Sequence, residues 1–238
     1  MVLASRPETA DSQLLCVNCQ ALLQGAKLFP HLCGACGFPQ PLREGENSFS
    51  LLGVRPLFGQ DESFLRARFY ELSRALHPDR FAAADPRARH NSIERMSRIN
   101  EAYRSLRDRK LLRETLLSLF EVGESVTALG NSARAQKGAP PVELAESWFE
   151  LQDAVMDDPN TAQTKILEFE KSLQFKRHAF DILMTEQEAL FDVSEGQDRV
   201  ALLEISRILR EVSYLDSLFR DVLRLKERLG GSPFLGSG

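Results

Sequence analysis

The chain has 238 residues, enough for one or two domains of ordinary size. Apolar residues make up 43% and charged residues 27%, as in a folded globular protein, and the net charge of −4 argues against a general nucleic-acid binder. No apolar run approaches the roughly 18 residues that span a bilayer, so we expect no membrane segment. The first residues carry Glu8 and Asp11 and lack the layout of an export signal, which predicts a cytoplasmic location.

Every cysteine of the chain lies in one of two C-x-x-C pairs near the N-terminus. The pairs occupy residues 16–19 and 33–36. Two facing turns of this kind supply four sulfurs at the corners of a tetrahedron, which suits zinc at metal–sulfur distances of about 2.3 Å. In a reducing compartment the spacing favours a metal site over disulfides. We therefore predict structural zinc, without an open coordination position, on Cys16, Cys19, Cys33 and Cys36.

Other interpretations of the four cysteines stay open at this point. They could form a redox dithiol or disulfides, or hold iron in a rubredoxin-like site or a cluster. A segment of about 30 residues buries little apolar surface, so metal binding would supply most of its folding energy. Gly34 and Gly37 are expected to serve turns that need a positive φ or a close backbone approach.

Two amphipathic helical patterns flank the tripeptide His77-Pro78-Asp79. Their apolar stripes are Leu65, Phe69, Leu72 and Leu76 before it, and Met96, Ile99, Tyr103 and Leu106 after it. Neither helix can bury its stripe alone, so we expect the two to pack as an antiparallel hairpin. Because Pro78 disfavours helical geometry in the preceding residue, the tripeptide is predicted to form an exposed loop at the tip of this hairpin.

Roughly residues 49–120 resemble a J domain, and specifically that of the HscB-type co-chaperones of iron-sulfur cluster assembly. The resemblance rests on F-S-L-L-G-V at 49–54, on Phe81 after the H-P-D-R run, and on S-R-I-N-E-A-Y-R-S-L at 97–106. A tetracysteine module before such a J domain also resembles some members of that family. After Asp108 the family usually has a proline, whereas here Arg109 follows. The helical pattern is expected to continue through Leu111, Leu112, Leu116 and Phe120.

The resemblance implies that this loop and the basic face of the helix before it bind a DnaK-type chaperone ATPase and stimulate its hydrolysis. The residues implied in the contact are His77, Pro78, Asp79, Arg74, Arg80, Arg68 and Arg66. Asp79 would offer its carboxylate to an arginine of the partner, and the arginines would face acidic surface. For each arginine the alternative is a solvated helix face. No orienting acid and nucleophile are evident around His77, so we expect binding and not catalysis.

The second half of the chain predicts a helical bundle. Glycine and proline interrupt residues 121–140, which we interpret as a linker. Helical patterns then follow from Pro141 to Asp157, from about Thr161 to Phe191, and from Val200 to Leu225, with a turn at 194–196. Short loops between them favour an antiparallel three-helix bundle.

The predicted fold class is therefore mainly all-α. We expect a tetracysteine module like a zinc ribbon or knuckle at 1–45, a J domain at 46–120, the linker, a three-helix bundle at 141–230, and a disordered tail at 231–238.

The resemblance further implies that the bundle binds an iron-sulfur scaffold protein. Residues 141–153 are similar to the family segment that contacts the scaffold, which puts Phe149 and Glu150 at scaffold-facing positions beside Trp148. Ala145 and Glu146 occupy neighbouring positions that are apolar in the family. Trp148 and Phe149 lie about 100° apart on a helix, so we do not expect both to be fully buried.

The predicted function is that of an adaptor and not an enzyme. It would deliver an iron-sulfur scaffold to a DnaK-type chaperone, stimulate the ATPase of that chaperone, and so promote cluster transfer. Two alternatives stay open, a J-domain co-chaperone for a different or unfolded client and a redox or cluster-carrying metal protein.

Overall fold

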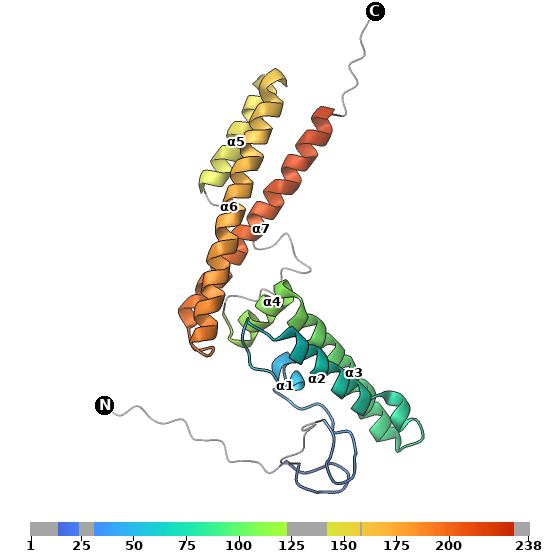
Figure 1. Cartoon of the computed structure of the whole chain (residues 1–238). Coiled ribbons are helices and arrows are strands. Elements are labelled where there is room, and N and C mark those ends of the chain that lie inside the picture. The colour runs from blue at the N-terminus through green and yellow to red at the C-terminus, as the bar shows by residue number, and fades with distance from the viewer. Residues whose placement is uncertain (1–13, 24–30, 123–141, 158, 231–238) are drawn as a thin grey trace, which may run out of the picture. The chain divides into compact units, whose positions relative to one another are not determined.

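The computed structural model describes residues 14–23, 31–122, 142–157 and 159–230. This part of the chain is helical, with two isolated β-bridges and no longer strand, so the predicted all-α class is confirmed (Figure 1). Most of the predicted linker and the whole predicted tail lie outside the described residues. Two compact units form, one from Met1–Pro56 with Gln60–Thr115, the other from Leu57–Gly59 with Leu116–Gly238. Within the described ranges, no helix is both long and apolar enough to cross a membrane.

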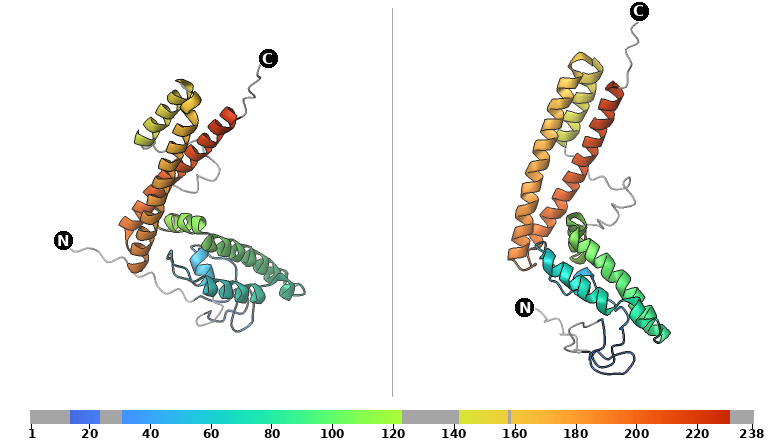
Figure 2. Two further views of the ribbon diagram at one scale, coloured as in Figure 1. Left: turned by 45° about the horizontal axis from the view of Figure 1, so that its top comes forward. Right: turned by 45° about the vertical axis from the view of Figure 1, so that its right-hand side comes forward.

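Unit 1 contains the predicted hairpin. Helices α2 (Glu62–Ala75) and α3 (Pro86–Arg107) run side by side in opposite directions, with the short helix α1 (Ser48–Leu52) packed on both (Figures 1 and 2). The short 3-10 helix η1 (Pro78–Phe81) follows α2 at the tip of the hairpin. The apolar stripes meet between the helices, where Leu65, Leu72, Leu76, Ile99, Ala102 and Leu106 are buried. Phe69 stacks on Tyr103 with ring centroids 4.2 Å apart.

Side-chain caps set where these helices begin. Asp61 accepts hydrogen bonds from the backbone N–H groups of Ser63 and Phe64, and Asp85 caps α3 just before Pro86. Each cap satisfies backbone donors that have no partner within the helix. The α1 helix ends at Gly53, whose φ of 64° lies in the left-handed region that glycine adopts without strain.

The helical pattern continues beyond α3, as predicted, but as a separate helix, α4 (Arg109–Leu119). Asp108 breaks the path because its backbone is extended, with φ −82° and ψ 122°. Its carboxylate accepts a hydrogen bond from the Leu111 N–H at 2.9 Å. Asp108 therefore ends α3 and caps α4, and the break forms here without a following proline.

Unit 2 contains the predicted three helices, α5 (Val142–Asp157), α6 (Pro159–Val193) and α7 (Arg199–Gly230), with α6 packed against both others. Figure 2 shows α6 and α7 as a long antiparallel pair with α5 beside them. The turn predicted between α6 and α7 is present, with Glu195 and Gly196 at positive φ. The buried core of the bundle is Leu144, Leu151, Val155, Ala162, Ile166, Phe169, Leu173, Leu215, Leu218, Val222 and Leu225.

Residues 57–59 join unit 2 through an aromatic cluster and one carboxylate. Phe58 and Phe120 each pack edge-on against Phe191, with centroids 5.3 and 5.5 Å away. Asp192 accepts hydrogen bonds from the N–H groups of Phe58 and Gly59 at 2.7 and 2.6 Å. A Cβ atom on Gly59 would lie 2.9 Å from the Asp192 carboxylate, so any other residue here would shift that side chain.

Replacing Asp192 with alanine is expected to lower the free energy of unfolding of unit 2 by about 1–3 kcal/mol, because two backbone donors lose a charged acceptor. Urea denaturation followed by far-UV circular dichroism measures this change. Glu186→Ala removes an exposed carboxylate from the same helix and is the matched control. Equal midpoints for the two variants would contradict the prediction.

Candidate functional site

The four cysteines lie on two turns of the same form. In the first turn, the Gln20 N–H donates to the Cys16 carbonyl, and in the second the Gly37 N–H donates to the Cys33 carbonyl, at 3.0 and 2.8 Å. Gln20 and Gly37 both have left-handed φ values, of 60° and 69°. The positive φ predicted for Gly37 is confirmed, whereas Gly34 does not adopt one.

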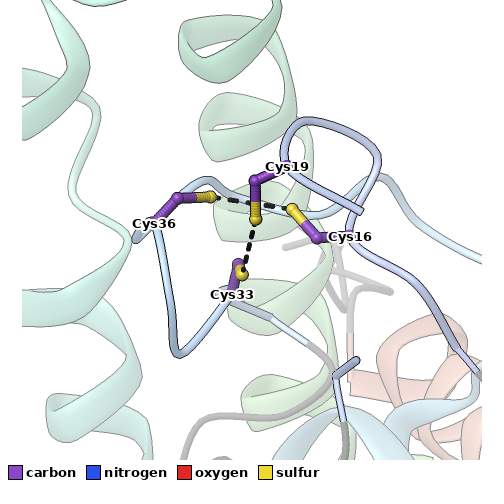
Figure 3. Close-up of side chains that lie close together, drawn as sticks. All are labelled: Cys16, Cys19, Cys33 and Cys36. Carbon is purple, nitrogen blue, oxygen red and sulfur yellow. Dashed lines mark hydrogen bonds between the residues drawn. The ribbon is translucent and has the colours of Figure 1, made fainter. Parts of the chain in front are cut away.

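The sulfur atoms of these turns converge on one point (Figure 3). All four lie within 4.8 Å of one another, with Cys16 to Cys36 and Cys19 to Cys33 each at 3.7 Å. A tetrahedron with metal–sulfur distances of 2.3 Å has edges of about 3.8 Å, so the donor set fits a four-thiolate metal site. The separations are far longer than a disulfide bond of about 2.05 Å, and all four cysteines are free thiols.

Hydrogen-bond donors surround the Cys16 sulfur. Burial raises the pKa of this thiol, but the N–H groups of Cys19 and Asn18 and the side-chain amide of Gln40 outweigh it and lower the pKa to about 6. The Ala21 N–H lowers the pKa of Cys19, yet the other three sulfurs raise it to about 12. The neighbouring sulfurs therefore disfavour a thiolate at Cys19, and a bound cation removes this penalty.

A buried arginine lies where this module packs on α3. The Arg95 side chain is 0% exposed and forms an ion pair with Glu46 at 3.1 Å. Its guanidinium also donates to the carbonyl oxygens of Gln40 and Pro41 and to Nδ1 of His31. Burial lowers the pKa of the Arg95 guanidinium, and Glu46 opposes that shift. A charge so far from water is tolerated only because acceptors surround it.

His31 occupies the other side of Arg95 as a neutral ring. Its Nε2 lies 2.9 Å from the carbonyl of Leu51 in α1, and its Nδ1 lies 3.0 Å from the Arg95 guanidinium. Because the carbonyl only accepts and the guanidinium only donates, Nε2 carries the proton. Burial, and then the Arg95 charge, lower the pKa of His31 to about 3.

The tripeptide forms an exposed turn, as predicted. The His77 and Asp79 side chains are 57% and 89% exposed, with Nδ1 of His77 3.5 Å from the Asp79 carboxylate. Nδ1 also accepts a hydrogen bond from the Asp79 N–H, and Pro78 occupies the first position of η1. The loop therefore presents an imidazole and a carboxylate outward in a fixed relation.

The predicted arginines divide into two kinds. Arg74 and Arg80 are exposed beside the loop, and the Arg80 guanidinium donates to the Arg74 carbonyl. Arg66 is also exposed, and its ion pair with Glu62, followed by Tyr103, raises its pKa. Arg68 differs because its side chain is only 14% exposed and pairs with Glu71 at 2.9 Å.

One face of α5 exposes both apolar and acidic side chains to solvent. Phe149 is 63% and Met156 82% exposed. The exposed residues of this helix recur at i, i+3, i+4, i+7, i+10 and i+11, which places them on one side. They are Glu146, Phe149, Glu150, Asp153, Met156 and Asp157, here called the α5 face. Trp148 instead packs on Phe169, with ring centroids 5.8 Å apart, so the two adjacent aromatic residues do separate.

Known proteins match this chain along most of its length. "Co-chaperone protein HscB homolog" of Shewanella woodyi is 26% identical over 186 residues, covering 77% of this chain and 98% of that protein. The protein of the same name from Shewanella sp. (strain ANA-3) is 28% identical with the same coverage. The chain is similar to proteins named as HscB co-chaperones over nearly their whole length. No family model matches it.

A solved structure shares the fold. The crystal structure of human co-chaperone protein HscB superposes with a TM-score of 0.58 at 18% identity, covering 90% of this chain and 98% of the human protein. The fold of the human protein is thus shared at low sequence identity.

The HscB resemblance implied no role for His31, Gln40 and Arg95. A signal was nevertheless present in the sequence. The two cysteine turns align with an offset that pairs Leu14 with His31 and Leu23 with Gln40, so polar side chains replace apolar ones in the second turn. Arg95 likewise precedes Ile99 by one turn, inside the apolar stripe of α3.

Proposed function

We propose that this protein is a J-domain co-chaperone of iron-sulfur cluster assembly that connects a scaffold protein to a DnaK-type chaperone. The observation that carries the proposal is the exposed His77–Asp79 loop at the tip of an HscB-like hairpin. Similarity to proteins named HscB co-chaperones supports the choice of pathway. The protein would act by binding, as an adaptor and not as an enzyme.

The loop is suited to binding an ATPase partner. The Asp79 carboxylate is free to accept a charge-assisted hydrogen bond from a partner arginine, which is stronger than a neutral one. Arg74 and Arg80 beside it, with Arg66 on α2, would orient an acidic partner surface and accelerate encounter. Arg68 is the weakest candidate of the four because its side chain is mostly buried.

The α5 face is suited to a partner surface with apolar and basic groups. Phe149 and Met156 expose apolar surface that binding would bury. The four acidic side chains around them supply negative charge. Exposed aromatic residues are frequent centres of binding energy. We propose that this face holds the iron-sulfur scaffold, with Phe149 at its centre and Glu150 beside it. Trp148 would support the face from behind.

We propose zinc as the resident metal of the cysteine site, held by Cys16, Cys19, Cys33 and Cys36. Bound there, zinc supplies a structural cross-link, since four protein ligands leave no position for water. Visible absorption of the purified protein tests this assignment. A colourless protein with one zinc per chain supports it, and strong visible absorption from iron–thiolate bonds contradicts it.

Placing both partner sites on one chain gives the proposed mechanism. A scaffold held by the α5 face is tethered to the loop that binds the ATPase, which raises the effective concentration of one partner for the other. The chaperone would then meet its client and its activator together.

The experiment is calorimetric titration of the full chain with its cognate iron-sulfur scaffold. Phe149→Ala is expected to weaken binding by roughly 10- to 100-fold, as for a hot-spot residue. Phe175→Ala is the matched control, because this phenylalanine on α6 is 76% exposed and lies outside the α5 face. A truncation at residue 140 is unsuitable, since Leu116 and Leu117 of the remaining chain are buried in unit 2.

A second candidate function is binding of unfolded clients. Exposed apolar side chains on α6 and α7, including Phe175, Val193 and Val200, favour it. Loss of affinity for an unfolded protein in Phe175→Ala, together with no scaffold binding by the intact chain, would support this function instead.

A further inference from the structure

One turn of α3 is bonded both to the cysteine module and to the segment that precedes the exposed loop. Asn91 donates its side-chain amide to the Pro39 carbonyl at 2.9 Å. The next residue, Ser92, donates its hydroxyl to the carbonyl of Leu76 at 2.6 Å, directly before His77. Both side chains are buried, so breaking either hydrogen bond would leave a buried polar group unpaired and cost free energy.

The residue that ends η1 packs against a buried cluster that contains two of the four cysteines. Phe81, the last residue of η1, contacts a small buried cluster to which α3 contributes Ala88. The other members of this cluster are Cys16, Leu23, Cys33 and Phe38. The loop is therefore held at both ends, by Ser92 before His77 and by this cluster after Asp79.

Arg95 and Gln40 connect the same helix to a sulfur atom. The Gln40 side-chain amide donates to Sγ of Cys16 at 3.3 Å, and its side-chain oxygen accepts from the Val17 N–H. The Gln40 main-chain carbonyl in turn accepts a hydrogen bond from Arg95. If the module unfolded, Arg95 would lose its acceptors at residues 31, 40 and 41, and α3 would lose its bonds to the module there.

We infer that the folded tetracysteine module positions the His77–Asp79 loop, and that Arg95 and Gln40 are positioning residues that make metal affinity and loop order depend on each other. Such coupling is reciprocal by thermodynamic necessity. Only its effect on a chaperone ATPase rests on the proposed function. Everything else follows from contacts within unit 1.

The first test uses the intact wild-type chain with and without zinc. Hydrogen exchange is expected to accelerate at least about 10-fold in peptides covering residues 76–92 when zinc is removed. Peptides from α6 and α7 are the internal reference and should change little. Equal exchange of residues 76–92 with and without zinc would overturn the inference.

The second test reads the coupling in the other direction. Arg95→Met is expected to weaken zinc binding roughly 10- to 100-fold in competition with a chromogenic chelator, as for residues that orient metal ligands. Arg98→Met is the matched control, because Arg98 lies on the same helix but is half exposed and pairs with Glu101. Gln40→Leu, which leaves α3 unchanged, should weaken zinc binding in the same direction. Wild-type zinc affinity in both Arg95→Met and Gln40→Leu would contradict the coupling.

A third readout separates this inference from the proposed function. Zinc-loaded wild-type protein should stimulate the ATPase of a DnaK-type chaperone, and zinc-free protein should stimulate it less. No stimulation by the loaded protein would refute the proposed function, whereas equal stimulation by both forms would refute the control of the loop by the module.

Discussion

Replacing Asp79 with asparagine is expected to reduce stimulation of a DnaK-type ATPase by about 10-fold or more, because the partner arginine loses its charged acceptor. The Asp79 side chain is 89% exposed and caps no helix, so the substitution should leave the fold intact. Single-turnover ATP hydrolysis, measured against the concentration of this protein, gives the effect.

Two comparisons make this result interpretable. Glu101→Gln removes one exposed negative charge from α3 and should stimulate like wild type. Thermal unfolding of Asp79→Asn should match that of wild type. Full stimulation by Asp79→Asn would mean that this loop does not carry the activity.

Replacing Cys33 with serine is expected to abolish tight zinc binding and to unfold the cysteine module. Metal binding by such sites contributes roughly 10–16 kcal/mol of apparent free energy, and that energy is also folding energy. Cys33 is buried and supplies one of the four sulfurs, so three ligands and a weak hydroxyl remain. Metal content by mass spectrometry should fall from one zinc per chain to well below one.

The helices of unit 2 provide the reference for this second prediction. The melting transition of α5, α6 and α7 should persist in Cys33→Ser, since no residue of these three helices belongs to unit 1. A Cys33→Ser protein that retains one zinc with wild-type affinity would show that the four sulfurs are not the ligand set.

Local patterns predicted the parts of this protein that depend on short stretches of sequence. The stripes ending at Leu76 and Leu106 fix which helix faces meet, and Pro78 fixes the loop between them. The spacing within each cysteine pair likewise determines its turn. Regularity over a few residues is sufficient in each case.

Contacts between distant residues were not predictable in this way. The bond from Arg95 to Gln40 spans 55 positions, and that from Phe58 to Asp192 spans 134. In neither pair does the local sequence around one residue predict which distant residue it contacts. The apolar spacing also did not predict where α3 ends. The spacing continues past Asp108, whereas the Asp108 side chain caps the next helix.

The insertion of residues 57–59 into unit 2 has a consequence for synthesis of the chain on the ribosome. Phe58 is translated 134 residues before Asp192, whose carboxylate accepts a hydrogen bond from the Phe58 N–H. At about 5–20 residues per second, an interval of roughly 7 to 27 seconds separates the two. Throughout that time an aromatic side chain destined for burial is exposed to solvent or to other nascent chains. Unit 1 can thus mature early, whereas unit 2 closes only near the end of translation.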